Sequence, residues 1–310
     1  TGSVSAATTV TVNNLAPVIT SFNAPVINED GTATVTGSFT DVGSLDTHTV
    51  TIDWGDSTSS AATVDPLTRT FSASHQYLDD APTATSSDVY TIGIVVTDDD
   101  TGSVSAATTV TVNNLAPVLA SLSNSSPDCG HAYMGVDAVT IAASFTDVGL
   151  LDTHTVSINW GDGITTVGSV VQGSGSGSVS GSHVYATGGI FTITVTLTDD
   201  DGGTSQLTSL ASIGGVGLHN GQLQIIGTEG RDVVHVNYGG SDGGSDGGAD
   251  RTLKVSANFN LANGKGGSDG GSDGGSDGGA DQFTFSLSDV TSILIIGCGG
   301  NDHLHVTKKV

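Results

Sequence analysis

The chain has 310 residues, of which 7 are Lys or Arg and 32 are Asp or Glu, and its formal net charge at pH 7 is −25. Such a charge repels phosphate backbones and anionic lipid surfaces, so nucleic acid is excluded as a partner. It favours divalent cations, because carboxylates are hard oxygen ligands. No apolar run approaches the roughly 18 residues that span a bilayer, so no membrane span is expected in this segment.

Two sets of internal matches establish a tandem repeat. Residues 1–18 recur without change at 101–118, and residues 38–56 recur almost unchanged at 144–162. A period of about 100 residues predicts an array of separate units rather than one enzyme core. We therefore expect four parts, which are residues 1–18, 19–118, 119–213 and 214–310.

Residues 1–18 match the segment that closes the first whole repeat. Their alternating AATTVTV face is built to be buried against a sheet. Two interpretations remain open. The segment is either the closing strand of a preceding repeat or a strand donated to a neighbouring molecule, which would link copies end to end.

The two repeats read as β-structure throughout. Apolar and β-branched residues alternate with small polar ones, with no sustained helical period, at 32–40, 47–54, 89–98 and 106–114. Turn residues separate such strands, so each repeat is predicted to be a β-sandwich of about seven strands. Trp54 and Trp160 are expected in the two cores, each followed by a tight Gly-Asp turn.

One motif carries a family resemblance. Each repeat contains WGD (54–56 and 160–162), then H-x-Y (75–77 and 183–185), then a strand ending in TDDD (97–100 and 198–201). This pattern resembles the polycystic kidney disease (PKD) domain. The resemblance implies an immunoglobulin-like sandwich that serves extracellular proteins as a spacer, adhesion or substrate-presenting module. We expect His75 and His183 to form core or turn hydrogen bonds rather than to bind a ligand.

Acidic loops are the main candidate sites, and some PKD-like domains hold calcium near the domain edge. In the first repeat, oxygens from three loops are expected to converge on one Ca²⁺ ion, those of Asn28, Glu29, Asp30, Asp41, Asp46, Asp98, Asp99 and Asp100. The second repeat keeps Asp147, Asp152, Asp199, Asp200 and Asp201 but reads YMGVD in place of INEDG, which predicts a weaker site. Alternatively, these carboxylates cap turns and face water.

From about residue 214 the composition becomes rich in Gly and Asp. Strand-like pieces lie at 221–227, 232–238, 251–259, 282–288 and 291–297, and four-residue SDGG repeats at 239–250 and 266–281 predict flexible acidic loops. Residues 227–235 and 297–305 resemble the nonapeptide of repeats-in-toxin β-rolls, in which stacked turns enclose calcium. Asp232 and Asp302 could share an ion only if the intervening strands fold back. Otherwise they occupy ordinary turns of a small sheet or short solenoid, which is the arrangement we expect.

The two cysteines, Cys129 and Cys298, fall in different predicted parts of the chain. A disulfide between them would have to join regions about 170 residues apart. We therefore expect free thiols.

The sequence thus predicts an all-β protein of tandem immunoglobulin-like β-sandwiches followed by a Gly-rich β-sheet or short solenoid unit. No nucleophile elbow or metalloprotease motif occurs, and only 5% of residues are aromatic, so we expect neither an enzyme nor an extended sugar-binding cleft. The favoured function is a calcium-stabilised structural subunit of an extracellular fibre, sheath or surface layer. The alternative is the stalk of a calcium-dependent cell-surface adhesin. Expected partners are copies of the chain or neighbouring repeats, with cell-surface glycans as a further candidate.

Overall fold

The computed structural model describes residues 3–80, 84–239, 252–259 and 280–307. Within these ranges every regular secondary-structure element is a β-strand, which confirms the all-β prediction. No helix of the length and hydropathy needed to cross a membrane occurs among the described residues. The predicted SDGG loops fall, except at their ends, outside these ranges.

The chain forms two compact units. Unit 1 comprises Thr1–Pro117 together with two short loop segments, Asp147–Thr153 and Asp199–Gly203. Unit 2 comprises Val118–Thr146, His154–Thr198 and Thr204–Val310.

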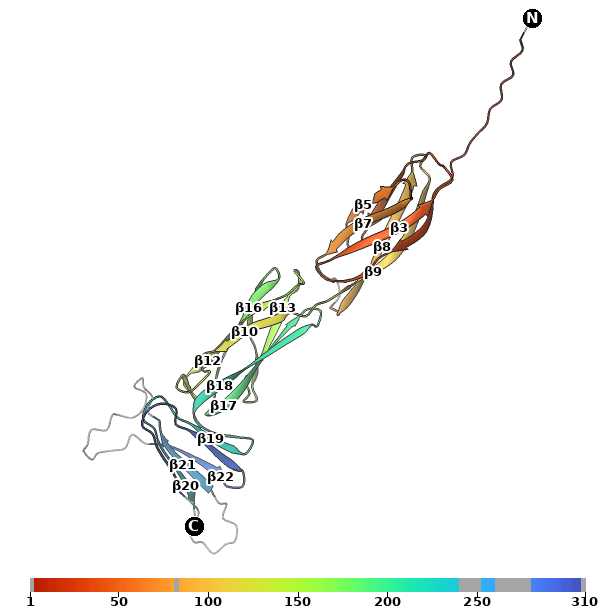
Figure 1. Ribbon diagram of the computed structural model, residues 1–310. Helices are drawn as coiled ribbons and strands as arrows, with labels where there is room; N and C mark the ends of the chain where they lie inside the picture. Colours follow the sequence, from red (N-terminus) through yellow and green to blue (C-terminus); the bar gives the residue numbers. More distant parts are fainter. Residues whose placement is uncertain (1–2, 81–83, 240–251, 260–279, 308–310) are drawn as a thin grey trace. The chain divides into compact units, whose positions relative to one another are not determined.

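Unit 1 contains a β-sandwich of a four-stranded and a five-stranded sheet (Figure 1), with strand orders β1-β3-β7-β6 and β2-β9-β8-β4-β5. In β3 every second residue is buried, including Val35 and Phe39, and these pack with Ile52 and Ile94 of the other sheet. The alternation that the sequence shows therefore places one face of each strand in a shared core. The strands are β1 (Val18–Asn23), β2 (Val26–Asn28), β3 (Gly31–Thr40), β4 (His48–Asp53), β5 (Ser59–Ala61), β6 (Thr63–Asp65), β7 (Thr70–Tyr77), β8 (Ser87–Asp98) and β9 (Ser103–Asn113).

Residues 3–17 precede β1 without forming a strand. Their sequence is that of β9 and its flanks, but the environment differs. Val10 and Val12 are 82% and 88% exposed, whereas Val110 and Val112 of β9 are fully buried.

Unit 2 contains three sheets. Their orders are β10-β12-β16-β15, then β14-β13-β17-β18-β19-β23 with β11 paired to β18, and β22-β21-β20-β24. The strands are β10 (Val118–Asn124), β11 (Ala132–Tyr133), β12 (Ala138–Thr146), β13 (His154–Asn159), β14 (Thr165–Val167), β15 (Ser169–Gly173), β16 (Ser176–Val184), β17 (Gly189–Asp199), β18 (Thr204–His219), β19 (Gln222–Ile226), β20 (Val233–Gly239), β21 (Thr252–Asn258), β22 (Asp281–Ser286), β23 (Ser292–Ile296) and β24 (His303–Val306).

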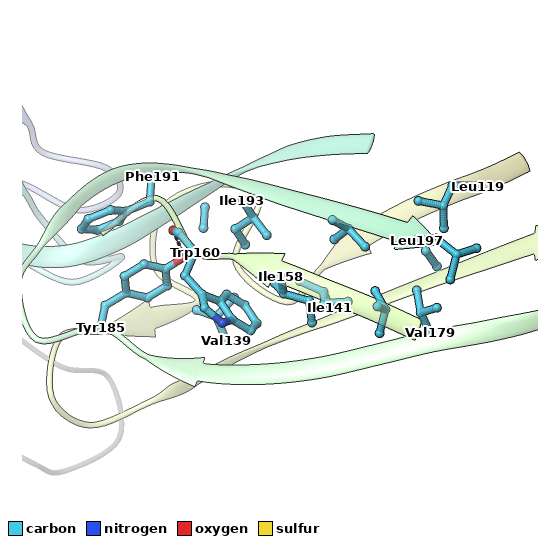
Figure 2. Close-up of a cluster of buried hydrophobic side chains, with 14 of the residues drawn as sticks. Leu119, Val139, Ile141, Ile158, Trp160, Val179, Tyr185, Phe191, Ile193 and Leu197 are labelled. Carbon is cyan, nitrogen blue, oxygen red and sulfur yellow. Dashed lines mark hydrogen bonds between the residues drawn. The ribbon is translucent and has the colours of Figure 1, made fainter. Parts of the chain in front are cut away.

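The first two sheets of unit 2 enclose a second sandwich core. Figure 2 shows Trp160 among aliphatic and aromatic side chains of the facing strands, including Ile141, Ile158, Tyr185 and Ile193. Trp160 and Trp54 are 0% and 1% exposed, which confirms the prediction that each Trp fills a core. The long strand β18 runs through residues 213 and 214 and carries the chain into the C-terminal sheets.

The WGD and H-x-Y motifs meet in each repeat. Tyr77 Oη donates a 2.8 Å hydrogen bond to the Trp54 carbonyl oxygen, and the His75 ring stacks on the Trp54 ring at 5.0 Å. His75 Nε2 lies 2.6 Å from Asp56 Oδ2, so the histidine bridges the two motifs as expected. Gly55 has φ +81°, and a Cβ there would lie 2.5 Å from the Thr91 carbonyl oxygen, which explains the glycine.

The second repeat reproduces this arrangement. Tyr185 Oη donates to the Trp160 carbonyl oxygen at 2.8 Å, the His183 ring stacks on Trp160 at 5.2 Å, and His183 Nε2 lies 2.7 Å from Asp162 Oδ2. Both histidines are therefore parts of the fold, as predicted.

The C-terminal region folds back on itself. Strand β19 pairs in parallel with β23, and β20 pairs in parallel with β24, each partner lying 70 positions later, as in Val233 opposite His303. The turns between these strands stack, because Gly227 N donates to the Ile296 oxygen and His303 N to the Asp232 oxygen, both at 2.7 Å. Strands β21 and β22 return the chain to the first turn, so the fold-back that Asp232 and Asp302 require in order to meet is present in this small sheet.

The expectation that both cysteines are free thiols is wrong. Cys129 and Cys298 form a disulfide with Cα atoms 5.7 Å apart. Both belong to unit 2, where β11, close after Cys129, pairs in parallel with β18. Their distance along the sequence was a poor guide because this pairing brings distant segments together.

Candidate metal centre

Carboxylates of unit 1 gather in two places, near opposite ends of strand β3. The Asp41 cluster contains Asp41, Asp46, Asp98, Asp99 and Asp100, and the Glu29 cluster contains Glu29, Asp79, Asp80, Asp147, Asp152, Asp199 and Asp201. Glu29 lies just before β3 and Asp41 just after it, and ten residues of strand span about 33 Å. The prediction that Glu29 converges with Asp41 and Asp98 on one ion is therefore wrong.

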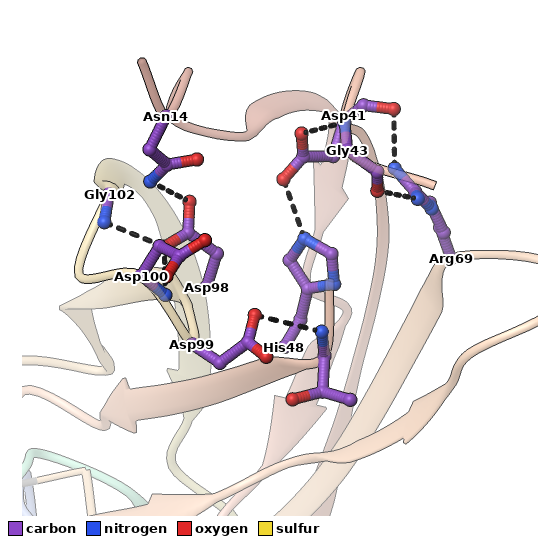
Figure 3. Close-up of polar contacts among 10 residues, drawn as sticks. Asn14, Asp41, Gly43, His48, Arg69, Asp98, Asp99, Asp100 and Gly102 are labelled. Carbon is purple, nitrogen blue, oxygen red and sulfur yellow. Dashed lines mark hydrogen bonds and ion pairs between the residues drawn. The ribbon is translucent and has the colours of Figure 1, made fainter. Parts of the chain in front are cut away.

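In the Asp41 cluster, both carboxylate oxygens of Asp41 and of Asp98 and one oxygen of Asp99 accept hydrogen bonds (Figure 3). Asp41 accepts from His48 Nε2 at 2.8 Å and from Gly43 N at 2.9 Å. Arg69 supports the same loop, because its guanidinium donates to the carbonyl oxygens of Asp41 and Gly43 at 2.6 and 2.8 Å. Burial would raise the pKa of Asp41, but the hydrogen bonds from His48 and Gly43 and the charges of His48 and Arg69 hold it below its ordinary value.

The TDDD turn supplies the rest of the Asp41 cluster. Asp98 Oδ1 accepts from Gly102 N at 2.7 Å and from Asp100 N at 3.0 Å, and its Oδ2 accepts from Asn14 Nδ2 at 2.9 Å. Asp99 Oδ1 accepts from Thr47 N at 3.1 Å. Several of these carboxylates cap turns, as the alternative interpretation proposes, but those of Asp41 and Asp98 are buried and do not face water. Burial, and then the charges of Asp41 and the TDDD residues, raise the pKa of Asp46.

The Glu29 cluster is more buried. Three triads, Glu29/Asp79/Asp152, Asp79/Asp80/Asp201 and Asp147/Asp152/Asp199, each place one ligand atom per residue within 4.8 Å of the others. Asp79 and Asp152 each belong to two triads, so the seven carboxylates form one continuous group. All except Asp79 are at most 9% exposed.

Glu29 is held in place but only half satisfied. Its Oε1 accepts a 2.6 Å hydrogen bond from Leu115 N, in the VNNLAPV segment. Its Oε2 is buried and has no hydrogen-bond partner within the described part of the chain, although Glu29 is only 2% exposed. A buried oxygen without a hydrogen-bond donor destabilises the fold, and a bound cation or a proton on the carboxylate would relieve this.

The electrostatics of the cluster agree with this need. Burial, and then the charge of Asp147 among others, raises the pKa of Glu29 to about 7. Burial, and then the charge of Glu29 among others, raises the pKa of Asp152 to about 8. Burial and the adjacent Asp201 raise the pKa of Asp80 to about 7, and the pKa of Asp201 is also raised. These carboxylates repel one another in a buried site.

No Lys or Arg of the repeats can neutralise this cluster. Arg69 is the only one among the first 230 residues, and it is bound to the Asp41 loop. A hard cation fits the donor set, because Ca²⁺ takes six to eight oxygen ligands at about 2.3–2.6 Å, so two of its ligands lie no more than about 5.2 Å apart. The 4.8 Å limit that each triad satisfies is within that range.

The two clusters share a turn geometry that reflects the repeat. Asp199 Oδ1 accepts from Gly203 N at 2.6 Å, and Asp199 Oδ2 accepts from Asn114 Nδ2 at 3.2 Å, as Asp98 does with Gly102 and Asn14. The repeated TDDD sequence therefore forms the same turn in both clusters. Glu29, Asp79 and Asp80 then contribute the further carboxylates of the Glu29 cluster, beside Asp199 and Asp201.

Several predicted ligands lie outside the Glu29 cluster. Asn28 Oδ1 accepts from Asn113 Nδ2 at 3.4 Å, and Asp30 Oδ1 accepts from Gln76 Nε2 at 2.7 Å. Asp200 Oδ1 accepts from Thr153 N at 2.8 Å. These side chains bind residues 46 to 85 positions away instead of joining the cluster.

The two C-terminal candidates meet in unit 2. Asp232 accepts from Thr228 N at 2.7 Å and from Thr228 Oγ1 at 2.8 Å, and its own N–H donates to Asp302 Oδ1 at 3.0 Å. The carboxylates thus join the stacked turns by hydrogen bonds. Calcium at Asp232 and Asp302 stays a prediction.

Sequence analysis missed Asp79 and Asp80. They follow the H-x-Y strand in the sequence YLDDAP, where the second repeat reads YATGGI. The adjacent pair of Asp residues was the available signal, but only the topology shows that this loop faces Glu29 and Asp201.

No protein-family model matches the chain, and no curated protein does. Similar solved structures include Titin-A168169, with 14% identity over 64% of this chain and 99% of that one and a TM-score of 0.34. The tetra-tandem repeat in the extending region of a large adhesion protein has 16% identity over 76% and 56%, with a TM-score of 0.37. The Bacteroides ovatus glucan-utilisation protein SGBP-B, solved with a mixed-linkage heptasaccharide, has 15% identity over 79% and 54%, with a TM-score of 0.24. Identities and TM-scores this low support no conclusion about function.

Proposed function

We propose that this chain is a non-catalytic spacer segment of an extracellular surface protein, and that Ca²⁺ bound by the Glu29 cluster stabilises its first unit. The observation that carries the proposal is the buried Oε2 of Glu29, which lacks a donor in a group of seven carboxylates. The repeated sandwich supplies the spacer, since each copy buries its own Trp-centred core.

Other features support an extracellular setting. The Cys129–Cys298 disulfide suits an oxidising compartment. The histidines of the repeated motif are engaged in stacking and hydrogen bonds within the fold, which favours a structural role for them over catalysis.

Calcium would act on the loops of unit 1. Segments 147–153 and 199–203 supply four of the seven carboxylates, and Glu29, Asp79 and Asp80 supply the others. An ion shared among them would replace mutual repulsion by coordination. Because it binds only the folded arrangement, it would stabilise unit 1 by mass action.

Calorimetric titration of the whole chain with Ca²⁺ tests this proposal. We expect Glu29→Gln to weaken binding about tenfold or more, by analogy with the loss of supporting groups at metal sites. Asp30→Asn is the matched control, because Asp30 is the next residue but binds Gln76 instead. Unchanged affinity in Glu29→Gln would overturn the assignment of the site.

A second candidate function, the subunit of a self-assembling fibre, is favoured by residues 3–17. Val10 and Val12 of this segment are exposed, although the corresponding Val110 and Val112 of β9 are buried in the sandwich core. A segment of this sequence can complete a sheet edge of another molecule by strand addition. Electron microscopy of the purified chain distinguishes the two candidates, because the fibre requires ordered filaments and the spacer does not.

A further inference from the structure

Three histidines share one face of the C-terminal sheet. Strands β20 and β24 are parallel neighbours, with His235 opposite His305 and Val233 opposite His303. The alternate residues of β20, Val234 and Val236, are buried in the core. His235 therefore points away from the core, and the register places His303 and His305 on the same side.

The rings of His303 and His305 both lie close to the ring of His235, and the three rings form a triangle with His235 at the shared corner. The His235 ring centre lies 5.8 Å from that of His303 and 5.7 Å from that of His305, with interplanar angles of 61° and 53°. A tetrahedral zinc ion with Zn–N bonds of about 2.0–2.1 Å places the centres of two coordinating imidazoles about 5.2 Å apart. Rotation of exposed side chains covers the remaining difference.

These rings also differ from the other six histidines of the chain in their partners. His48, His75 and His183 lie within 2.8 Å of a carboxylate oxygen, and the nitrogens of three further histidines contact the Cys129 oxygen (His131), Gln172 Oε1 (His154) and the Gly188 oxygen (His219). Within the described residues, the contacts of the three clustered rings are those with one another, without a hydrogen bond or an ion pair. Their nitrogens are thus available as ligands.

The backbone beneath the triangle is fixed from both sides. Before it, the stacked turns join through Asp232 N to Asp302 Oδ1 and His303 N to the Asp232 oxygen. After it, Thr307 N donates to the Val236 oxygen at 2.9 Å. Ligands on rigid strands keep their mutual geometry, which raises affinity.

We propose that His235, His303 and His305 bind a Zn²⁺ ion through one imidazole nitrogen each. Imidazole-only ligand sets suit zinc and other borderline metals rather than Ca²⁺, which requires oxygen ligands, so this site is chemically distinct from the Glu29 cluster. His303 and His305 are exposed, so the fourth coordination position of the ion is open to water.

Zinc titration of the whole chain in excess Ca²⁺ tests the proposal, since Ca²⁺ competes with Zn²⁺ for carboxylate ligands but not for imidazole. We expect one zinc equivalent whose dissociation constant rises about tenfold or more in His235→Asn and in His305→Asn. His131→Asn is the matched control, because His131 is exposed but lies outside the triangle and should leave the equivalent intact.

Imidazole NMR spectra provide an independent readout. Zinc should shift the resonances of three histidines, and these should be the ones lost in the His235, His303 and His305 variants. His305 is exposed on the strand at one edge of its sheet, so far-UV circular dichroism should show that His305→Asn keeps the fold. Zinc affinity unchanged in both Asn variants, or shifts confined to other histidines, would overturn the proposal.

Discussion

The backbone N–H of Asp232 donates a 3.0 Å hydrogen bond to Oδ1 of Asp302, 70 residues further along the chain. The bond joins two turns of related sequence, and it lies between the parallel pairs β19–β23 and β20–β24. One turn therefore caps the other, and the inserted strands β21 and β22 extend the same sheet instead of separating the turns.

The first prediction concerns Glu29 without metal. Glu29→Gln removes a buried charge that lies among other carboxylates, so in a chelator it should raise the unfolding free energy of unit 1 by about 1–3 kcal/mol. With Ca²⁺ the same variant should gain less stability than the wild type. Thermal unfolding with and without Ca²⁺ checks both expected changes in stability. A variant that is less stable than the wild type in the chelator would contradict the inference that Glu29 is repelled by the neighbouring carboxylates.

The second prediction is a pH dependence of the metal-free protein. The folded-state pKa values of Glu29 and Asp80 are raised to about 7 and that of Asp152 to about 8. A raised pKa contributes stability that is present below the unfolded-state pKa and is lost as the pH rises through the folded-state value. The unfolding temperature of unit 1 in a chelator should thus fall between about pH 5 and pH 8.

Excess Ca²⁺ should oppose this fall, because the ligand carboxylates must be deprotonated to bind and affinity rises with pH. The double variant Glu29→Gln/Asp152→Asn is the control, and its chelator profile should be flatter. A metal-free unit 1 that is more stable at the higher pH would show that the Glu29 cluster does not determine the pH dependence of its stability.

The third prediction tests the two Trp-centred cores. Trp54→Ala and Trp160→Ala should each cost about 3–5 kcal/mol, because each ring is buried and its loss leaves a cavity. Each variant should lower the transition of its own unit in a calorimetric scan and leave the other in place. Leu67→Ala, at a residue 94% exposed, should change neither transition. Loss of both transitions together would contradict independent cores.

The fourth prediction concerns the disulfide of unit 2. Cys298→Ser should lower the stability of unit 2 by about 2–5 kcal/mol, because the bond closes a loop of 169 positions in the unfolded chain. Cys129→Ser and a reducing agent on the wild type should produce the same shift. The transition of unit 1 serves as the internal control, and an unshifted unit 2 transition would show that the bond does not form in solution.

The strands and cores of the repeats could be predicted from sequence because they depend on local alternation. Val35 and Phe39 lie on the buried face of β3 because successive side chains of a strand point to opposite faces, and these apolar residues alternate with polar ones. The WGD and H-x-Y motifs also indicated where Trp54 would be buried, although not that Tyr77 would bind its carbonyl oxygen.

The acidic site could be predicted only in part, because burial of a carboxylate depends on topology. The sequence placed Glu29 and Asp41 in one site, but β3 separates them by its full length. It left out Asp79 and Asp80, whose neighbours Glu29, Asp152 and Asp201 come from loops 50 or more positions away. For the same reason it missed the Cys129–Cys298 bond, which depends on long-range pairing in unit 2.

The last prediction tests the fibre candidate through residues 3–13. If this segment pairs with a sheet edge of another molecule, the side chains of Val10 and Val12 become buried there, as those of Val110 and Val112 are in β9. Charged residues at those positions would prevent the pairing, so Val10→Lys/Val12→Lys should abolish the concentration-dependent oligomers that the fibre candidate requires. Both side chains are exposed in the single chain, so the double variant should keep its fold and its Asn14–Asp98 hydrogen bond. Sedimentation velocity checks the outcome, with Thr9→Lys, which lies on the opposite face of the segment, as the matched control. Oligomers that persist in the double variant would show that the segment is not donated, and a wild-type chain that stays monomeric at all concentrations would leave the spacer as the function.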